Sequence, residues 1–404
     1  MKTVPLGPFL GMNNRLPDTR LHVKDKGDFV RNAVNVDVTT AGTVKRRQGL
    51  TKLVGGDSCH SFYAHGDDAY YADGANLYRL TGTLDTPARI LVRDDLPLGR
   101  TLSFCDMAGT LIYSDGLELH RLTGSVSERY TIPTPNLAPS ITITTGALPG
   151  GLYQVTYTSV GPQGMESGAF PPVQVSVPDN GGLSIAVPDN TRVFVSPCNG
   201  DMLFFVGEGP IVSVTTPTDG GEPCQTLNLH PLPGGDIVRY RYGRLHVAKG
   251  EVLYYSQPFA PGLFNPLGDW LVFPEKINVL EPINQGIWLV TDKTYWMPGT
   301  DPSKAELLEQ LPYGAAFGSG LSFPDRNQVA WMSDRGMCLA DGSGAVQNVQ
   351  EANVVTNPVA SGAVMLREED GMKQLLASSL EAGQSLAAAR TFMDAEVIRK
   401  ESLL

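Results

Sequence analysis

Two stretches of the chain, 42 residues apart (113 − 71, counted between Tyr71 and Tyr113), carry the same order of residues. Residues 62–82 (FYAHGDDAYYADGANLYRLTG) align with residues 104–124 (FCDMAGTLIYSDGLELHRLTG). Both begin with Phe, contain Tyr-x-Asp-Gly in the middle and end with Leu-x-Arg-Leu-Thr-Gly. Asp-Gly allows the positive φ of a tight hairpin turn, so each copy predicts two strands joined at that dipeptide.

Three weaker copies follow, at residues 240–258, 286–299 and 329–349. Each has an apolar run, a turn rich in Asp, Gly or Lys, and a second run that is often aromatic. A repeat of about 40 residues built from antiparallel strands is typical of β-propeller blades. The sequence therefore predicts a propeller-like domain, with a number of blades that these copies do not fix.

The composition favours strands over helices. Glycine (44) and proline (30) are too frequent for a helical bundle or coiled coil. Short alternating or β-branched runs such as 152–160, 173–177 and 192–196 are bounded by turn residues, which predicts strands. Only residues 303–311 could form a short helix, and residues 379–400 could form either a helix or two strands.

The repeat is interrupted between about 130 and 235. Within 137–230, Arg192 is the only Lys or Arg, against seven Asp or Glu, and strand-like runs recur about every ten residues. The expected fold is all-β: a β-propeller-like domain with an inserted immunoglobulin- or fibronectin-like β-sandwich. We assign 1–50 to an N-terminal segment and hairpin, 51–136 and 231–360 to blades, 137–230 to the sandwich and 361–404 to a closing segment.

Charge limits the function. The net charge is −11, whereas residues 1–50 alone carry nine Lys or Arg against four Asp. A protein that grips nucleic-acid phosphates needs Lys and Arg, so the chain is not expected to hold DNA, although DNA could slide past it. Five scattered cysteines without CxxC predict no disulfides and synthesis in a reducing cytoplasm. We expect no signal peptide and no membrane insertion.

No catalytic, cofactor or metal motif stands out, and none is expected. The sequence lacks a phosphate-binding loop and a nucleophile elbow. Asp57, Cys59, His60 and His65 match no zinc spacing, so we favour a solvated loop and strand there. Asp73, Asp115 and Asp334 recur at equivalent turns, which indicates turn formation rather than glycosidase chemistry. The strand aromatics are expected to pack in the core.

The first fifty residues contain a distinctive series of motifs. GMNN (11–14) precedes RNAVNVDVTTAGTVKRRQGLTKL (31–53), which predicts a hairpin with its turn at Gly42. With residues 152–170 and 243–266, this series resembles the tail hub or nozzle proteins of short-tailed bacteriophages, including packaged-DNA stabilisation proteins. The motif positions that match are Gly11, Asn13, Asn14, Ala33, Asn35, Asp37, Gly42, Arg47 and Gly49.

The resemblance implies a structural virion protein. Copies would form a ring, expected to be a hexamer, below portal and adaptor proteins, conduct DNA without binding its sequence, and anchor spikes or fibres. Six residues are candidates for contact with a neighbouring subunit: Lys45, Arg46, Arg47, Phe259, Leu263 and Phe264. For the basic cluster, alternatives are a solvated strand or contact with DNA; for the three apolar residues, the alternative is anchoring their own loop.

Two other functions stay open. Propellers also occur as carbohydrate-binding or glycoside-cleaving proteins, which would show as a pocket with two carboxylates at a glycosidase separation. A third possibility is a β-rich scaffold that never assembles into a ring.

Overall fold

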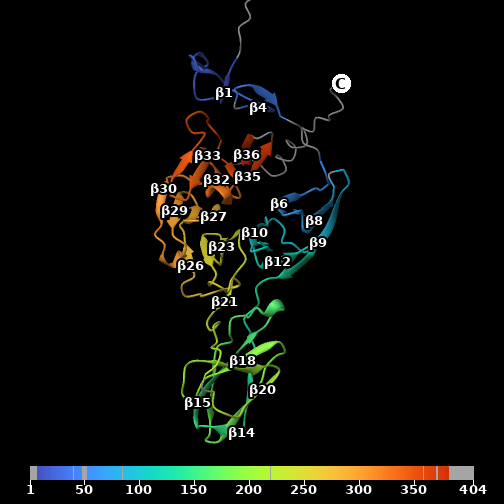
Figure 1. The fold of residues 1–404 in the computed structure, drawn as a ribbon, viewed down its shortest axis with the longest axis vertical. Helices are drawn as coiled ribbons and strands as arrows, with labels where there is room; N and C mark the ends of the chain where they lie inside the picture. Colours follow the sequence, from blue (N-terminus) through green and yellow to red (C-terminus); the bar gives the residue numbers. More distant parts are fainter. Residues whose placement is uncertain are drawn as a thin grey trace, which may run out of the picture. The chain divides into compact units, whose positions relative to one another are not determined.

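The computed structural model describes residues 7–39, 41–47, 52–83, 85–218, 220–357, 359–369 and 372–381. Its contacts divide the chain into two compact units, one made of Met1–Gly56, Gly82–Ala88 and Phe273–Leu404 and the other of Asp57–Thr81 and Arg89–Val272. In the part of the chain that is described, the regular structure is β-strand apart from four short 3-10 turns (Figure 1). These turns are η1 (Asp18–Arg20), η2 (Pro162–Gly164), η3 (Pro302–Lys304) and η4 (Pro324–Arg326).

Five four-stranded antiparallel sheets follow one another along the chain, each with its strands in sequence order. The first contains β6 (Cys59–His65), β7 (Asp68–Asp73), β8 (Asn76–Gly82) and β9 (Pro87–Arg93). The second contains β10 (Ser103–Met107), β11 (Thr110–Ser114), β12 (Leu119–Thr123) and β13 (Val126–Arg129). The third contains β22 (Ile237–Arg241), β23 (Arg244–Lys249), β24 (Val252–Tyr255) and β26 (Trp270–Val272). The fourth contains β27 (Val279–Ile283), β28 (Gly286–Val290), β29 (Thr294–Pro298) and β30 (Leu308–Leu311). The fifth contains β31 (Leu321–Phe323), β32 (Gln328–Ser333), β33 (Gly336–Asp341) and β34 (Val346–Asn348).

The five sheets coincide with the two copies of the repeat and its three weaker copies, which confirms the predicted propeller-like fold. The expected Asp-Gly turns lie between β7 and β8 and between β11 and β12, with Gly74 at φ 62° and Gly116 at φ 87°. In three sheets a buried hydroxyl ends the second strand or follows it directly: Ser114, Thr291 and Ser333. Each accepts a hydrogen bond from a backbone N–H two residues on, so the side chain adds to the backbone pairing that holds the turn.

Several central strands of these sheets, such as β11, β28 and β32, are buried on both faces. All five residues of β28 are buried, and its sequence GIWLV is apolar throughout instead of alternating. Within each unit, neighbouring sheets share a hydrophobic core. Residues of the first and second sheets form one core, those of the second and third a further core, and those of the fourth and fifth another, which contains the buried Trp288 and Trp331. Most of the strand aromatics that were expected in the core are therefore in it.

The inserted region is a seven-stranded sandwich, drawn in green in Figure 1. One sheet has the order β14-β17-β20 and the other β16-β15-β18-β19. Their apolar inner faces form a single core that includes Tyr153, Tyr157 and Ile185. The strands are β14 (Ser140–Leu148), β15 (Gly151–Ser159), β16 (Val173–Val177), β17 (Gly181–Ala186), β18 (Thr191–Val195), β19 (Phe204–Glu208) and β20 (Ile211–Val214).

Smaller sheets complete the fold. The N-terminal segment forms a three-stranded sheet and the predicted hairpin, in which Gly42 has φ 73°. β21, which follows the sandwich, pairs with β25 from the loop between β24 and β26 of the third sheet. A long hairpin follows the fifth sheet and packs on it. These strands are β1 (Phe9–Met12), β2 (His22–Val23), β3 (Gly27–Val30), β4 (Val36–Val38), β5 (Val44–Arg46), β21 (His230–Pro231), β25 (Leu263–Phe264), β35 (Val359–Glu369) and β36 (Met372–Glu381).

One predicted helix is wrong. Within residues 303–311, only the first two belong to the single turn η3, and Leu308–Leu311 form the outer strand β30. Leu311 and Glu309 pair with Thr294 and Tyr295 of β29, so tertiary pairing at the sheet edge overrides the helical preference of the local sequence. Of residues 379–400, β36 reaches Glu381 and the rest lie outside the described residues.

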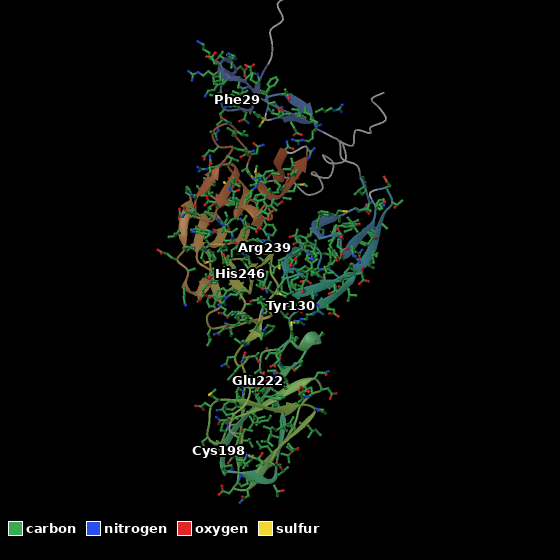
Figure 2. All side chains as sticks on the ribbon, viewed as in Figure 1. Phe29, Tyr130, Cys198, Glu222, Arg239 and His246 are labelled. Carbon is green, nitrogen blue, oxygen red and sulfur yellow. The ribbon has the colours of Figure 1, made fainter. Side chains whose placement is uncertain are left out.

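The third sheet contains a buried histidine without hydrogen-bond partners. His246 of β23 is fully buried, and among the described residues neither ring nitrogen has a partner (labelled in Figure 2). Burial, and to a lesser degree the charge of Arg244, lowers its pKa to about 3. The folded chain therefore holds this imidazole neutral at pH values where an unfolded chain would protonate it.

His246 should make the protein less stable in mild acid. As the pH falls from about 6.5 towards 3, the unfolded chain binds a proton that the folded chain does not, which lowers the free energy of unfolding by up to about 1.4 kcal/mol per pH unit. His246→Leu removes this dependence and, because it also removes two unsatisfied nitrogens, costs little at pH 8. Denaturant unfolding from pH 8 to pH 4 measures both effects.

The matched control is His230→Leu, which replaces an exposed histidine and should leave the pH dependence of the wild type unchanged. An equal loss of stability in acid for the wild type and His246→Leu would contradict the assignment.

Candidate functional site

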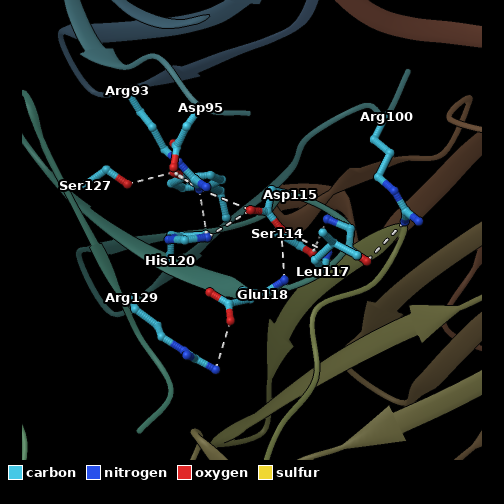
Figure 3. A network of polar contacts seen from close by, with 12 residues as sticks. Arg93, Asp95, Arg100, Ser114, Asp115, Leu117, Glu118, His120, Ser127 and Arg129 are labelled. Carbon is cyan, nitrogen blue, oxygen red and sulfur yellow. Dashed lines mark hydrogen bonds and ion pairs between the residues drawn. The ribbon is translucent and has the colours of Figure 1, made fainter. Parts of the chain in front are cut away.

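A group of charged side chains, centred on the buried Asp115, surrounds the Asp-Gly turn of the second sheet (Figure 3). Asp115 is 2% exposed. Its Oδ2 lies 3.0 Å from Nε2 of His120 and accepts from Arg93 of β9 at 3.1 Å. Its Oδ1 accepts from the backbone N–H groups of Leu117 and Glu118 at 2.9 and 2.8 Å. Both carboxylate oxygens are therefore occupied in fixing the turn and joining it to the neighbouring sheet.

The pKa values fit a structural role for this group. Burial raises the pKa of the Asp115 carboxyl, but the hydrogen bonds from His120, Glu118 and Leu117 outweigh burial and hold that pKa well below its usual range. Burial lowers the pKa of Arg93, yet hydrogen bonds to Asp95 and Tyr113 raise it overall. A general acid near neutral pH needs a raised pKa, whereas the pKa of Asp115 is lowered.

Removing the Asp115 charge should destabilise the fold and change its response to acid. Asp115→Asn leaves the half-buried Arg93 with a weaker partner and removes a buried charge from the turn, so the free energy of unfolding should fall by about 3 kcal/mol. In the wild type, the stabilisation by this carboxylate is present above its unfolded pKa of about 4 and is lost as the pH falls below it. The variant should lack that loss in a comparison of chemical unfolding at pH 6 and pH 3.

Asp94→Asn is the matched control, since Asp94 is exposed and lies next to Arg93 in the sequence. If Asp115→Asn proves no less stable than Asp94→Asn, the turn does not depend on this carboxylate.

The two histidines considered for a metal site contact different partners in the structure. His60 contacts Ser61 and the carbonyl of Gly74, whereas His65 lies 3.4 Å from Asp106. Among the described residues, no group of three or more His, Cys, Asp or Glu side chains could hold a metal ion. In the same part of the chain, no helix is long and apolar enough to span a membrane.

The structure divides the predicted basic cluster. Lys45 and Arg46 are exposed on β5. Arg47, by contrast, donates from Nε and Nη2 to Oδ1 of buried Asp37, at 3.0 and 2.7 Å, and Arg367 lies 3.9 Å from the other oxygen. The hydrogen bond from Arg47 is the main cause that lowers the Asp37 pKa, against the effect of burial. Arg47 thus stabilises its own hairpin, and Lys45 and Arg46 remain the surface-facing members.

The GMNN motif joins the N-terminal segment to residues that follow the fifth sheet. Asn13 is 2% exposed; its side-chain oxygen accepts from the N–H groups of the two residues after Asn14, and its amide donates to Asn353 at 3.2 Å. The Asn14 side chain exchanges hydrogen bonds with the backbone of Val355, at 3.1 and 2.7 Å. The two asparagines therefore attach the ends of one unit to each other. Of the other motif positions, Asn35 has φ 54°, and Gly49 lies outside the described residues.

The predicted apolar residues have different roles in the loop after β24. Leu263 is buried, and Phe264 is half-buried with its ring 5.5 Å from that of Tyr254. Both belong to β25, which pairs with β21, so they anchor the loop. Phe259 is 98% exposed and has φ 62°, an unusual conformation for a bulky residue. Of the three, Phe259 is the residue available to a partner.

A cavity of about 350 Å³ lies beside Phe259, and residues 130–132 and 222–226, which connect the sandwich to the sheets, contribute to its walls (Tyr130 and Glu222 are labelled in Figure 2). Arg192 of β18 forms ion pairs in this cavity with Glu166 and Glu222. Thr158 donates to the second oxygen of Glu166 at 3.1 Å. The apolar part of the wall includes Ile132, Met165, Phe194 and Pro261.

The ion pairs fix the charges of the cavity. The hydrogen bond from Arg192 lowers the pKa of Glu222, and the bonds to both glutamates raise the pKa of Arg192. One cation and two carboxylates leave a net negative charge. The sequence marked Arg192 as the only cation of its region, but not its partners, because residues 166 and 222 meet it only in the folded chain.

The fold and this cavity define an all-β protein with propeller-like sheets and an inserted sandwich. No protein-family model matches the sequence, and no curated protein is significantly similar to it. The solved structures that match this chain include two with low identity. One is BBS1N in complex with ARL6DN, with 11% identity, coverage of 81% of this chain and 91% of that chain, and a TM-score of 0.35. The other is the extracellular domain of BT4673 from B. thetaiotaomicron, with 11% identity, coverage of 87% of this chain and 47% of that chain, and a TM-score of 0.35.

Proposed function

We propose that this chain is a structural subunit of the ring-shaped nozzle or hub of a short bacteriophage tail. Copies form a ring that conducts DNA during ejection and anchors spikes or fibres, with portal and adaptor proteins as neighbours in the virion. The ring is expected to be a hexamer. The chain acts through contacts between subunits, not through catalysis.

The ordered set of N-terminal motifs carries this proposal. Its residues resemble those of tail hub and nozzle proteins, and several of them hold the N-terminal segment in place. Asn13 and Asn14 attach the N-terminal segment to Asn353 and Val355, and Asp37 and Arg47 stabilise the hairpin that follows. A motif that organises a surface-exposed hairpin is what a subunit with a fixed place in an assembly requires.

The charge of the chain suits a conduit. Every Lys or Arg that contacts a phosphate slows the passage of DNA, because the contact must be broken before the strand moves on. A subunit with a net charge of −11 provides few such contacts. The proposal therefore places acidic or neutral surface along the ring axis, with Lys45 and Arg46 away from it.

The proposal predicts assembly of the full chain. Negative-stain microscopy and analytical ultracentrifugation of the purified protein, over a range of concentrations and with purified tails that lack it, should show rings with an open centre. Class averages give the number of subunits directly. A chain that stays monomeric at every concentration, and also beside the incomplete tails, would overturn the proposal.

The cavity beside Phe259 favours one alternative, a carbohydrate-binding function. Exposed aromatic rings next to carboxylates are common in sugar sites, and here Phe259 lies beside Glu166 and Glu222. A glycosidase also needs one carboxyl with a raised pKa, whereas that of Glu222 is lowered. Binding of host polysaccharide that is lost in Phe259→Ala, without release of reducing sugar, would support a carbohydrate-binding protein.

A further inference from the structure

We propose that the cavity beside Phe259 receives the basic β4–β5 hairpin of a second copy of this chain, with Arg46 as the inserted side chain. Lys45, its neighbour on β5, adds positive charge from the other face of the hairpin. The inference rests on the proposed ring and names the contact that closes it. The acceptor lies in one unit of the chain and the donor in the other, so each copy carries both halves of the contact.

We place the acceptor surface at Phe259 because this side chain is held in the solvent in an unfavourable conformation. A phenylalanine that is 98% exposed gains nothing from burial, and its positive φ adds backbone strain. The loop does not relax, because Gln257 donates its backbone N–H to Leu263 at 2.8 Å and Leu263 is buried. A rigid, protruding aromatic residue is typical of the anchors that dominate protein interfaces.

The cavity next to this ring suits a basic side chain. Its apolar wall, which includes Ile132, Met165 and Phe194, can cover the aliphatic part of a Lys or Arg. The exposed Glu222 offers a carboxylate for the charged end, and Phe259 offers an aromatic face for a cation–π contact. The volume, about 350 Å³, is sufficient for one long side chain with its solvent.

Charge identifies the donor within the chain itself. Residues 1–50 carry nine Lys or Arg against four Asp, and 137–230 carry Arg192 against seven Asp or Glu. The hairpin is the basic cluster of an otherwise acidic protein, and Lys45 and Arg46 are exposed on it. Complementary charges on different parts of one chain favour copies that bind head to tail and close by rotation.

The test uses reversed charges on full-length chains. A donor variant carries Lys45→Glu and Arg46→Glu; an acceptor variant carries Glu208→Lys and Glu222→Lys, where Glu208 is the exposed strand partner of Arg192. Each variant alone should assemble into rings more weakly than wild type by about tenfold or more. An equimolar mixture of the two should recover assembly, because both kinds of contact between unlike copies again join opposite charges.

Matched controls carry the same charge changes at other exposed sites. Lys24→Glu with Lys26→Glu changes the N-terminal segment, and Asp179→Lys with Asp201→Lys changes the sandwich near Gly150 and Gln154. Both controls should assemble like the wild type. Thermal unfolding verifies that all four variants are folded, and Phe259→Ala, which changes no charge, should weaken assembly in the same assay.

The outcomes separate the contact from the ring. If both charge-reversed variants form rings as readily as the wild type, this contact is overturned and the proposed function stands. If each variant loses ring assembly and the mixture does not recover it, this contact is also overturned. The reversed residues would then pair within one chain or with another partner. A wild-type chain that forms no ring, alone or with tails that lack it, overturns the proposed function and this contact together.

Discussion

A buried hydroxyl at the end of the second strand is the constraint on which the second, fourth and fifth sheets depend. Ser114, Thr291 and Ser333 occupy this place in three sheets, and an aspartate follows each of them in the sequence. Because each hydroxyl satisfies a backbone N–H in the turn, the chain can reverse inside the protein without leaving that group unpaired. The strands on either side are then free to bury both faces, which explains the apolar runs of the fourth and fifth sheets.

The sequence predicts local features of this fold well and distant ones poorly. The Tyr-x-Asp-Gly repeat located the hairpins, because turn chemistry and strand patterning are both local. It could not show that Arg93 of the first sheet binds Asp115 of the second, since that pairing depends on how the sheets pack. The predicted helix at 303–311 is wrong for the same reason. Residues 308–311 pair with the edge of β29, and no local feature of the sequence indicates that pairing.

The candidate contact residues show the same division. Sequence alone grouped Arg47 with Lys45 and Arg46, but in the structure Arg47 forms an ion pair with the buried Asp37 of its own hairpin. It also grouped Phe259 with Leu263, although β25 buries Leu263 and leaves the phenylalanine outside. What remains is a protruding aromatic ring beside an acidic cavity, and an exposed basic hairpin. A protein with these features is suited to binding further copies of itself, and its acidic balance suits a passage for DNA.

Hydrogen–deuterium exchange, compared between the free chain and the assembled ring, tests this account most directly. The account predicts slower exchange on assembly at β5 and at residues 257–264, and unchanged exchange in central strands such as β28. Equal exchange at both segments before and after assembly, with protection elsewhere, would contradict the view that these two surfaces build the ring.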